Sequence, residues 1–161
     1  MKINSFMDLY LKRGSIFRKL IDIGEWVVIL SVAIFFPRPR INFYPLNYLL
    51  GIGFFILGFY LHYLAHKTNP YAHCSKDKVE KLITNGIYRK MRHPVYAGYI
   101  LMYLGAFFTL SSLWTLFPIS IFSLIFYHSA MEEERFLSKK FGQEYQLYIM
   151  KVPWKFIPYI F

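Results

Sequence analysis

Two long stretches without a charged side chain constrain this sequence more than any other feature. No Asp, Glu, Lys or Arg occurs in the 39 residues 93–131, and none occurs in the 26 residues 41–66. A helix that crosses a bilayer needs about 20 consecutive apolar residues. The longer stretch therefore suffices for two crossings and the shorter one for a single crossing, so the pattern predicts that a membrane is the solvent.

The composition excludes several other classes of protein. Of the 161 residues, 56% are hydrophobic and 17% are charged, whereas soluble domains are about 45–50% apolar and about a quarter charged. Disorder is thereby excluded, and the lone Cys74 excludes a module held together by internal disulfides. The net charge of +10 would suggest nucleic acid if the cations lay on a polar scaffold. They flank apolar stretches instead, so no nucleic-acid partner is expected.

We predict a single all-α membrane domain over residues 1–161 with about four transmembrane helices. The long uncharged stretch divides at Ser111-Ser112 into a tight hairpin, and the segment 20–36 is the weakest prediction because Asp22 and Glu25 lie in its first turns. Glycines at 51, 53 and 58 form no G-x-G-x-x-G after a strand, so we expect no Rossmann domain and assign these glycines to helix packing. The predicted spans are 20–36, 46–64, 95–110 and 113–131.

The distribution of cations predicts the orientation of these spans. Short cytoplasmic segments collect Lys and Arg, and with four spans and both termini cytoplasmic, 17 of the 19 cations fall on the cytoplasmic side. After the last span, Leu137, Phe141, Tyr145 and Tyr148 recur at helical spacing. We expect this amphipathic helix to lie in the membrane interface and to end before Pro153.

Two polar clusters on the predicted cytoplasmic side are candidates for chemistry. The first is the segment 82–96, which enters the third span, and the second is Glu132-Glu133-Glu134-Arg135, which leaves the fourth. Because the two spans form a tight hairpin, their distant ends return to one membrane face. We therefore expect the clusters to be neighbours, able to bind a polar zwitterion. The alternative is that the cations only anchor the helices and the carboxylates only neutralise them.

The order of residues in these clusters adds a resemblance. The string L-I-T-N-G-I-Y-R-x-x-R-H-P-x-Y-x-G begins at Leu82, and E-E-x-x-L-x-x-x-F-G-x-x-Y-x-x-Y-x-x-x-V-P begins at Glu133. Together they resemble the isoprenylcysteine carboxyl methyltransferase family and its phospholipid methyltransferase relatives. The resemblance covers residues 82–158, about half of the chain. It implies a multi-pass membrane enzyme that uses S-adenosyl-L-methionine, with residues 1–81 as spans and basic loop and residues 82–161 as the cofactor-binding half.

The resemblance also implies which residues hold the cofactor. The ammonium, carboxylate and hydroxyl groups of S-adenosylmethionine suit carboxylate, imidazole and phenol partners, and a proline is well placed at a first helical position. No metal is required for methyl transfer, in which positioning and exclusion of water do most of the work. The implied cofactor-binding residues are Leu82, Ile83, Tyr88, His93, Pro94, Tyr96, Glu133 and Glu134.

Two departures from the family pattern concern the acceptor. Prenylcysteine-type members tend to have an Arg about one turn before the Glu pair, where this chain has His128, and another before V-P, where it has Lys151. We take His128 and Lys151 as candidate catalytic residues. Since Lys and Arg differ in carboxylate recognition, the acceptor stays open between an isoprenylcysteine-like carboxylate and a lipid amine or thiol. His128 could accept a proton from the latter two.

Two rival functions and one rival site remain. A sterol-type membrane reductase would bind NADPH at the same end of the bundle, and a non-enzymatic protein would only bind anionic lipid. His62 and His66 lie one helical turn apart and could ligate a metal, but no third ligand follows at a supporting spacing. We expect no metal site, and partners limited to the bilayer and a lipophilic acceptor.

Overall fold

The computed structural model describes residues 15–72 and 79–160, with side chains from residue 20 onward, so Cys74 lies outside the described residues. Within them the predicted all-α class is confirmed: no strand occurs, and the single isolated bridge joins Arg40 to Ser112. The elements, in chain order, are α2 (Ser15–Phe35), α3 (Leu46–Thr68), η2 (Gly86–Arg89), α4 (Pro94–Leu110), η3 (Leu113–Thr115), α5 (Leu116–Phe141) and α6 (Gln143–Lys151).

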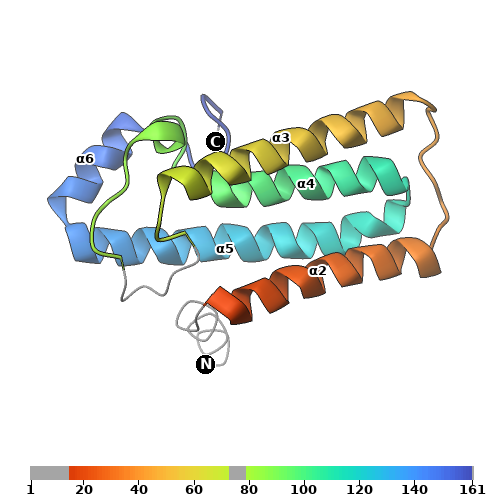
Figure 1. Ribbon diagram of the computed structural model, residues 1–161, viewed down its shortest axis with the longest axis horizontal. Helices are drawn as coiled ribbons and strands as arrows, with labels where there is room; N and C mark the ends of the chain where they lie inside the picture. The colour runs from red at the N-terminus through yellow and green to blue at the C-terminus, as the bar shows by residue number, and fades with distance from the viewer. Residues whose placement is uncertain (1–14, 73–78, 161) are drawn as a thin grey trace.

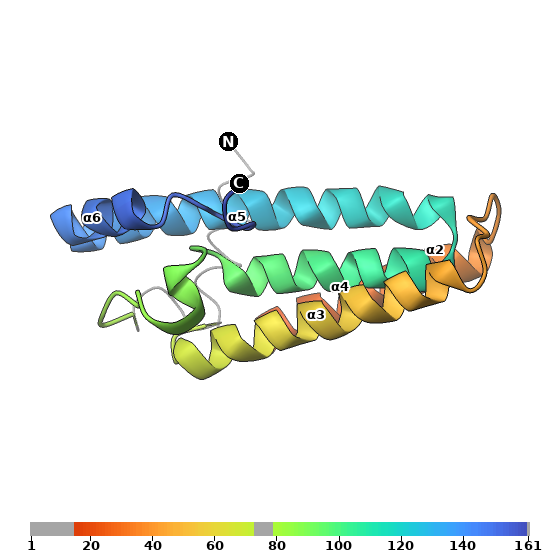
Figure 2. The same ribbon diagram turned by 90° about the horizontal axis from the view of Figure 1, so that it is seen from above.

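The helices α2, α3, α4 and α5 lie side by side along the long axis of the molecule (Figure 1). Seen from above, α4 lies between α3 and α5 (Figure 2). One end of this bundle carries the connection 36–45 and η3, and the other carries η2, α6 and the C-terminus. The hairpin through Ser111 therefore sends α4 and α5 back to the same end, as the sequence predicts.

Glycines bring α3 and α4 into close contact. A Cβ added to Gly58 would lie 2.6 Å from the carbonyl oxygen of Gly98, and one added to Gly51 would lie 3.0 Å from that of Gly105. Such backbone-to-backbone packing is typical of small residues at membrane helix interfaces. The packing role predicted for Gly51 and Gly58 is confirmed, but the one for Gly53 is wrong because no atom of another described segment lies within 4 Å of its Cβ position.

The carboxylates of α2 are paired inside the bundle. The hydroxyl of Tyr99 on α4 donates to Asp22 at 2.8 Å, and the hydroxyl of Tyr103 donates to Glu25. Trp26 packs edge-on against the ring of Tyr103. These contacts explain how an apolar helix with two acids can still pack in the bundle, since the half-buried Asp22 and the buried Glu25 each find a hydrogen-bond donor.

Two segments in the described part of the chain are long and apolar enough to cross a membrane: α3 and Leu113–Phe141, which joins η3 to α5. Helix α4 is apolar but has only 17 residues. Along α3 the side chains of Leu49, Ile52, Ile56 and Phe59 point out of the bundle and are all more than half exposed. This stripe follows one helical face, which is where lipid would contact a membrane helix.

The region after the fourth predicted span differs from the prediction. Helix α5 continues to Phe141, the chain bends at Gly142 with a positive φ of 51°, and α6 follows. Tyr145 and Tyr148 are buried against Val152 inside the protein. The expectation that this apolar face meets the membrane interface is therefore wrong for these two residues, because an amphipathic pattern does not distinguish lipid from a neighbouring protein surface.

Candidate functional site

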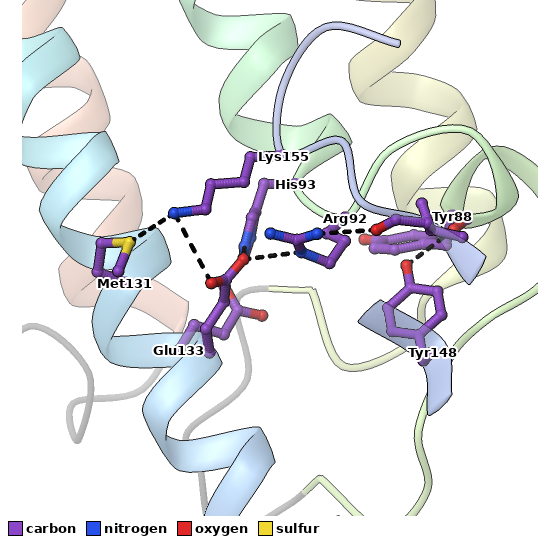
Figure 3. A network of polar contacts seen from close by, with 9 residues as sticks. Tyr88, Arg92, His93, Met131, Glu133, Tyr148 and Lys155 are labelled. Carbon is purple, nitrogen blue, oxygen red and sulfur yellow. Dashed lines mark hydrogen bonds and ion pairs between the residues drawn. The ribbon is translucent and has the colours of Figure 1, made fainter. Parts of the chain in front are cut away.

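The two predicted clusters meet at the end of the bundle that carries η2 and α6. His93 precedes α4, and Glu133 and Glu134 lie on α5. The Nε2 atom of His93 is 3.0 Å from Oε1 of Glu134, and its Nδ1 atom is 3.7 Å from Oε2 of Glu133 (Figure 3). The expected proximity of the clusters is thus confirmed, with one imidazole between two carboxylates.

The two carboxylates have different surroundings. Glu134 is only 13% exposed and accepts hydrogen bonds on Oε1 from His93 and from Nε of Arg92, the latter at 2.8 Å. Glu133 is 39% exposed. Glu134 therefore holds the cluster together, whereas Glu133 presents a carboxylate that a ligand can reach.

The C-terminal tail pairs with the segment that carries Arg92 and His93. The backbone N–H of Arg92 donates to the carbonyl of Trp154, and that of His93 donates to the carbonyl of Lys155, both at 2.9 Å. The Nη1 atom of Arg92 also donates to the carbonyl of Val152 at 2.8 Å. The ring of Phe156 lies 5.8 Å from that of His93. These contacts fix the tail after Pro153, where the sequence shows no periodicity.

Tyr88 is fixed by three segments that are distant in sequence. Gly86, with a positive φ of 56°, opens η2, and this turn buries Tyr88. Asn69, which caps α3, donates to the Tyr88 hydroxyl at 3.2 Å, and the hydroxyl of Tyr148 donates to the Tyr88 carbonyl at 2.8 Å. The turn that the sequence predicts at Asn85-Gly86 is confirmed.

The remaining predicted cofactor residues line the same end of the bundle. Pro94 is buried at the first turn of α4, as predicted, and the ring of Tyr96 lies 5.8 Å from His93 and 5.5 Å from Phe126. Leu82 packs on the cluster of Tyr145, Tyr148 and Val152. Ile83, the next residue, is half-buried.

A groove of about 360 Å³ runs between α5 and α6 beside this cluster. The hydroxyl of Tyr145 is buried there, and none of the described residues accepts or donates a hydrogen bond to it. A buried polar atom without a partner is uncommon, so this hydroxyl is available to a ligand. The groove is lined by Met131, Glu134, Arg135, Ser138, Lys139, Tyr145 and Ile149.

The electrostatics of the cluster favour a protonated imidazole. Burial by itself would lower the pKa of His93, but the hydrogen bonds and charges of Glu133 and Glu134 outweigh it, so the pKa is raised. Burial raises the pKa of Tyr88, Tyr145 and Tyr148. Their hydroxyls therefore stay protonated and able to donate at neutral pH.

Four residues considered from the sequence lie outside the cluster. His128 and Lys151 are exposed, and no interaction of either with the cluster occurs among the described residues. The rings of His62 and His66 are 4.4 Å apart. Within residues 15–72 and 79–160, no group of three His, Cys, Asp or Glu side chains is arranged to hold a metal ion.

Sequence reasoning missed three contributors to the site: Arg92, Lys155 and Tyr145. Arg92 looked like one more cytoplasmic cation, yet its side chain is 5% exposed and bonded to Glu134. Tyr145 was assigned to the membrane interface. Lys155 carries no motif signal at all, because its position depends on the backbone pairing of the tail with residues 92 and 93.

The fold and this cluster define an all-helical protein with its polar site at one end of an apolar bundle. The phospholipid methyltransferase family model matches residues 46–144, which include η2, α4, Glu133 and Glu134. The chain belongs to this family.

Curated relatives carry related names. The chain is 30% identical over 145 residues to protein-S-isoprenylcysteine O-methyltransferase B of Arabidopsis thaliana, covering 83% of this chain and 68% of that protein. It is 34% identical over 128 residues to protein-S-isoprenylcysteine O-methyltransferase of Schizosaccharomyces pombe, covering 73% of this chain and 53% of that protein. A Delta(14)-sterol reductase of Mus musculus is 30% identical over 83 residues, which are 50% of this chain and 20% of that protein. The matched part of the chain thus spans 53% to 68% of the length of these two methyltransferase relatives.

Proposed function

We propose that this protein is a membrane methyltransferase that transfers a methyl group from S-adenosylmethionine to a lipophilic acceptor. The observation that carries the proposal is the meeting of His93 with Glu133 and Glu134 at one end of the bundle. These residues lie within the stretch that the family model matches. Relatives named as isoprenylcysteine O-methyltransferases support an acceptor with a long apolar chain.

The proposed topology has four spans, α2 to α5, with both termini and the residue 69–93 connection in the cytoplasm. The exposed apolar stripe of α3 supports contact with lipid, and the side-by-side packing of the four helices supports a common membrane layer (Figure 1). Apart from Arg38 and Arg40, the cations whose side chains the structure describes lie at the end that carries η2 and α6, as the positive-inside rule requires of the cytoplasmic end. The site then lies where the membrane meets the cytoplasm.

The residues present fit S-adenosylmethionine. Glu133 offers a partly exposed carboxylate for the ammonium group, and the Tyr145 hydroxyl offers a buried hydrogen-bonding atom beside the groove. The groove volume of about 360 Å³ falls in the range of about 300–1,000 Å³ that small-molecule sites occupy. Leu82 packs on the cluster that contains Tyr145 and would supply an apolar edge for the adenine, with the half-buried Ile83 as its next residue.

The chain's own residues act by binding and by positioning. When bound, the cofactor supplies an electrophilic methyl group on a sulfonium. Glu133 would bind its ammonium group, while Glu134, held by Arg92 and His93, keeps α4 and α5 in register. The tail from Trp154 to Phe156 covers the cluster and so excludes water from it. Exclusion of water and fixed geometry favour an in-line displacement.

Calorimetric titration of the purified protein in detergent with S-adenosylhomocysteine and, separately, with NADPH tests this function. Binding of S-adenosylhomocysteine without binding of NADPH is expected. The rival reductase function is favoured by the match to the mouse Delta(14)-sterol reductase, and binding of NADPH alone would establish it. Binding of neither ligand would favour a protein that only contacts lipid.

Cysteine labelling tests the topology. In a Cys74→Ser background, Thr84→Cys and Tyr44→Cys place single thiols at exposed positions at opposite ends of the bundle. An impermeant maleimide should label Tyr44→Cys in intact cells and Thr84→Cys only after the inner face is opened. The reverse pattern would contradict the cytoplasmic placement of the site.

The proposed catalytic roles of His128 and Lys151 rest on the resemblance alone. With an amine or thiol acceptor, His128 would take up the proton that the acceptor loses. A His128→Ala variant with full activity would leave the residue as a helix-end anchor.

A further inference from the structure

Lys155 has a set of partners that is poor for a mostly buried cation. Its side chain is only 20% exposed, and its ammonium nitrogen lies 2.9 Å from the sulfur of Met131 and 3.9 Å from Oε2 of Glu134. A thioether is a weak acceptor, and Glu134 already accepts two hydrogen bonds on its other oxygen. A buried ammonium has three donors to satisfy, so this one has capacity for a further anionic partner.

The position of Lys155 is held by backbone and not by its charge. Its carbonyl accepts the N–H of His93 at 2.9 Å, and the preceding carbonyl, of Trp154, accepts the N–H of Arg92. The following residue, Phe156, packs on His93 and lies 6.3 Å from the ring of Tyr127. The side chain therefore projects from a fixed point toward α5, as Figure 3 shows.

The surroundings of the ammonium combine an apolar side and a polar side. It lies 5.4 Å from the ring centroid of Tyr127, which is on the outer surface of α5 one turn from the exposed Leu124. On its other side lies the cluster of His93 and Glu134. An amphiphile could place its chain along Tyr127 and Leu124 and its head group at Lys155.

We propose that Lys155 binds the anionic group of the methyl acceptor and so determines acceptor specificity. The inference rests on the proposed methyltransferase function and deepens it by naming the residue that recognises the acceptor. Two sources share this chemistry, the carboxylate of an S-prenylcysteine and the phosphodiester of a phospholipid. When the acceptor is a carboxylate, the reaction needs no base. The carboxylate oxygen forms a bond to the methyl carbon, and the bond from that carbon to the sulfonium sulfur breaks with its electrons staying on sulfur. The negative charge of the carboxylate and the positive charge of the sulfonium are both neutralised. In the phospholipid case the methyl acceptor is an amine beside the phosphodiester, and methylation of this amine also releases a proton.

The test compares an acid with its neutral ester. Binding of S-farnesyl-N-acetylcysteine and of its methyl ester is measured at saturating S-adenosylhomocysteine for the wild type, Lys155→Met, Lys155→Arg and Lys140→Met. Lys140 is an exposed lysine of α5 and serves as the matched control. The wild type and Lys140→Met should bind the acid at least about tenfold more tightly than the ester, because a charge-assisted hydrogen bond contributes about 1.5–3 kcal/mol. In Lys155→Met this preference should fall below about twofold. Lys155→Arg should retain most of it.

A second arm identifies the source of the anion. The same variants are titrated with phosphatidylethanolamine and with uncharged diacylglycerol in mixed micelles. The phosphodiester would be the anion if the wild type prefers phosphatidylethanolamine over diacylglycerol, Lys155→Met loses that preference, and the wild type does not distinguish the farnesyl acid from its methyl ester. A Lys155→Met protein that keeps the wild-type preferences in both arms, or a wild type with none, would overturn the proposal.

The two proposals fail in different ways. Affinity for S-adenosylhomocysteine reports on the methyltransferase function and on folding, and it should change by less than about twofold in Lys155→Met because the proposed cofactor contacts of Glu133 and the Tyr145 hydroxyl do not involve the Lys155 ammonium. The acid-to-ester ratio reports on Lys155. A wild type that binds no S-adenosylhomocysteine, but shows a Lys155-dependent preference for the acid without it, would refute the function and leave the anion site standing.

Discussion

Glu134 and Glu25 are both buried carboxylates in this bundle, yet their partners belong to different chemical classes. Glu134, at the end of the bundle, faces the cationic Arg92 and His93. Glu25, inside the bundle, is 5% exposed and accepts a hydrogen bond from the neutral hydroxyl of Tyr103. The first is an ion pair at the end of the bundle, and the second is a polar contact between α2 and α4.

The difference indicates what each carboxylate does. Removing one member of a buried ion pair leaves an uncompensated charge and is costly, whereas interhelical hydrogen bonds within membranes contribute little. The cluster around Glu134 should therefore govern both folding and ligand binding. The Glu25 contact should govern only how α2 packs against α4, and four measurements test this contrast.

The largest effect is expected for Glu134→Leu. The change leaves the guanidinium of Arg92, with its side chain 5% exposed, without its carboxylate, at a cost of about 3–5 kcal/mol. We expect a large drop in thermal stability in detergent and loss of S-adenosylhomocysteine binding. The matched double variant Arg92→Leu with Glu134→Leu should be more stable than Glu134→Leu alone. Equal or lower stability of the double variant would mean that the pair is not coupled.

A smaller and more selective effect is expected for Glu133→Gln and His93→Ala. Each should weaken S-adenosylhomocysteine binding by at least about tenfold, because a charge-assisted hydrogen bond contributes about 1.5–3 kcal/mol. Glu132→Gln is the matched control, since Glu132 pairs with the exposed Arg135. Calorimetry measures all three, and unchanged affinity in both site variants would refute the proposed position of the cofactor.

The protonation of His93 should appear as a pH dependence of stability. Its pKa is raised by Glu133 and Glu134 against the opposing effect of burial. The stabilisation is therefore fully present below the unfolded pKa of about 6.5 and is lost as pH rises through the higher folded value. Thermal unfolding between about pH 6 and 9 should show this loss, and in Glu133→Gln it should occur at lower pH. Identical profiles for wild type and Glu133→Gln would contradict the assignment.

The sequence predicted the parts of the fold that short-range chemistry determines. The start of α4 at Pro94 and the return of α5 beside it follow from a proline and from a hairpin without charge. The end of α5 could not be predicted from where charged residues begin, because charges do not stop a helix. Gly142, with its positive φ, is what ends it.

Only the part of the site that lies within the two sequence motifs was predictable. The hairpin predicted that the segment 82–96 and the carboxylates after the fourth span would meet, whereas the family resemblance singled out Tyr88, His93 and Glu133 within them. Lys155 could not be found, since its location depends on backbone hydrogen bonds between segments about 60 residues apart in the sequence. His128 was chosen by its sequence position, and in the structure it is an exposed residue of α5.

The smallest effect is expected for Tyr103→Phe, which removes the hydroxyl that donates to Glu25. Hydrogen bonds between membrane helices average about 0.6 kcal/mol and reach about 1.7 kcal/mol, so a modest decrease in thermal stability should result. The ring packing of Trp26 on residue 103 is kept in the variant, and Glu25 loses only a neutral partner. Binding of S-adenosylhomocysteine should stay within about twofold of wild type, because no contact with His93 or Glu134 is touched. A tenfold loss of affinity in Tyr103→Phe would show that the carboxylate inside the bundle acts on the same site as Glu134, and the contrast between the two would no longer hold.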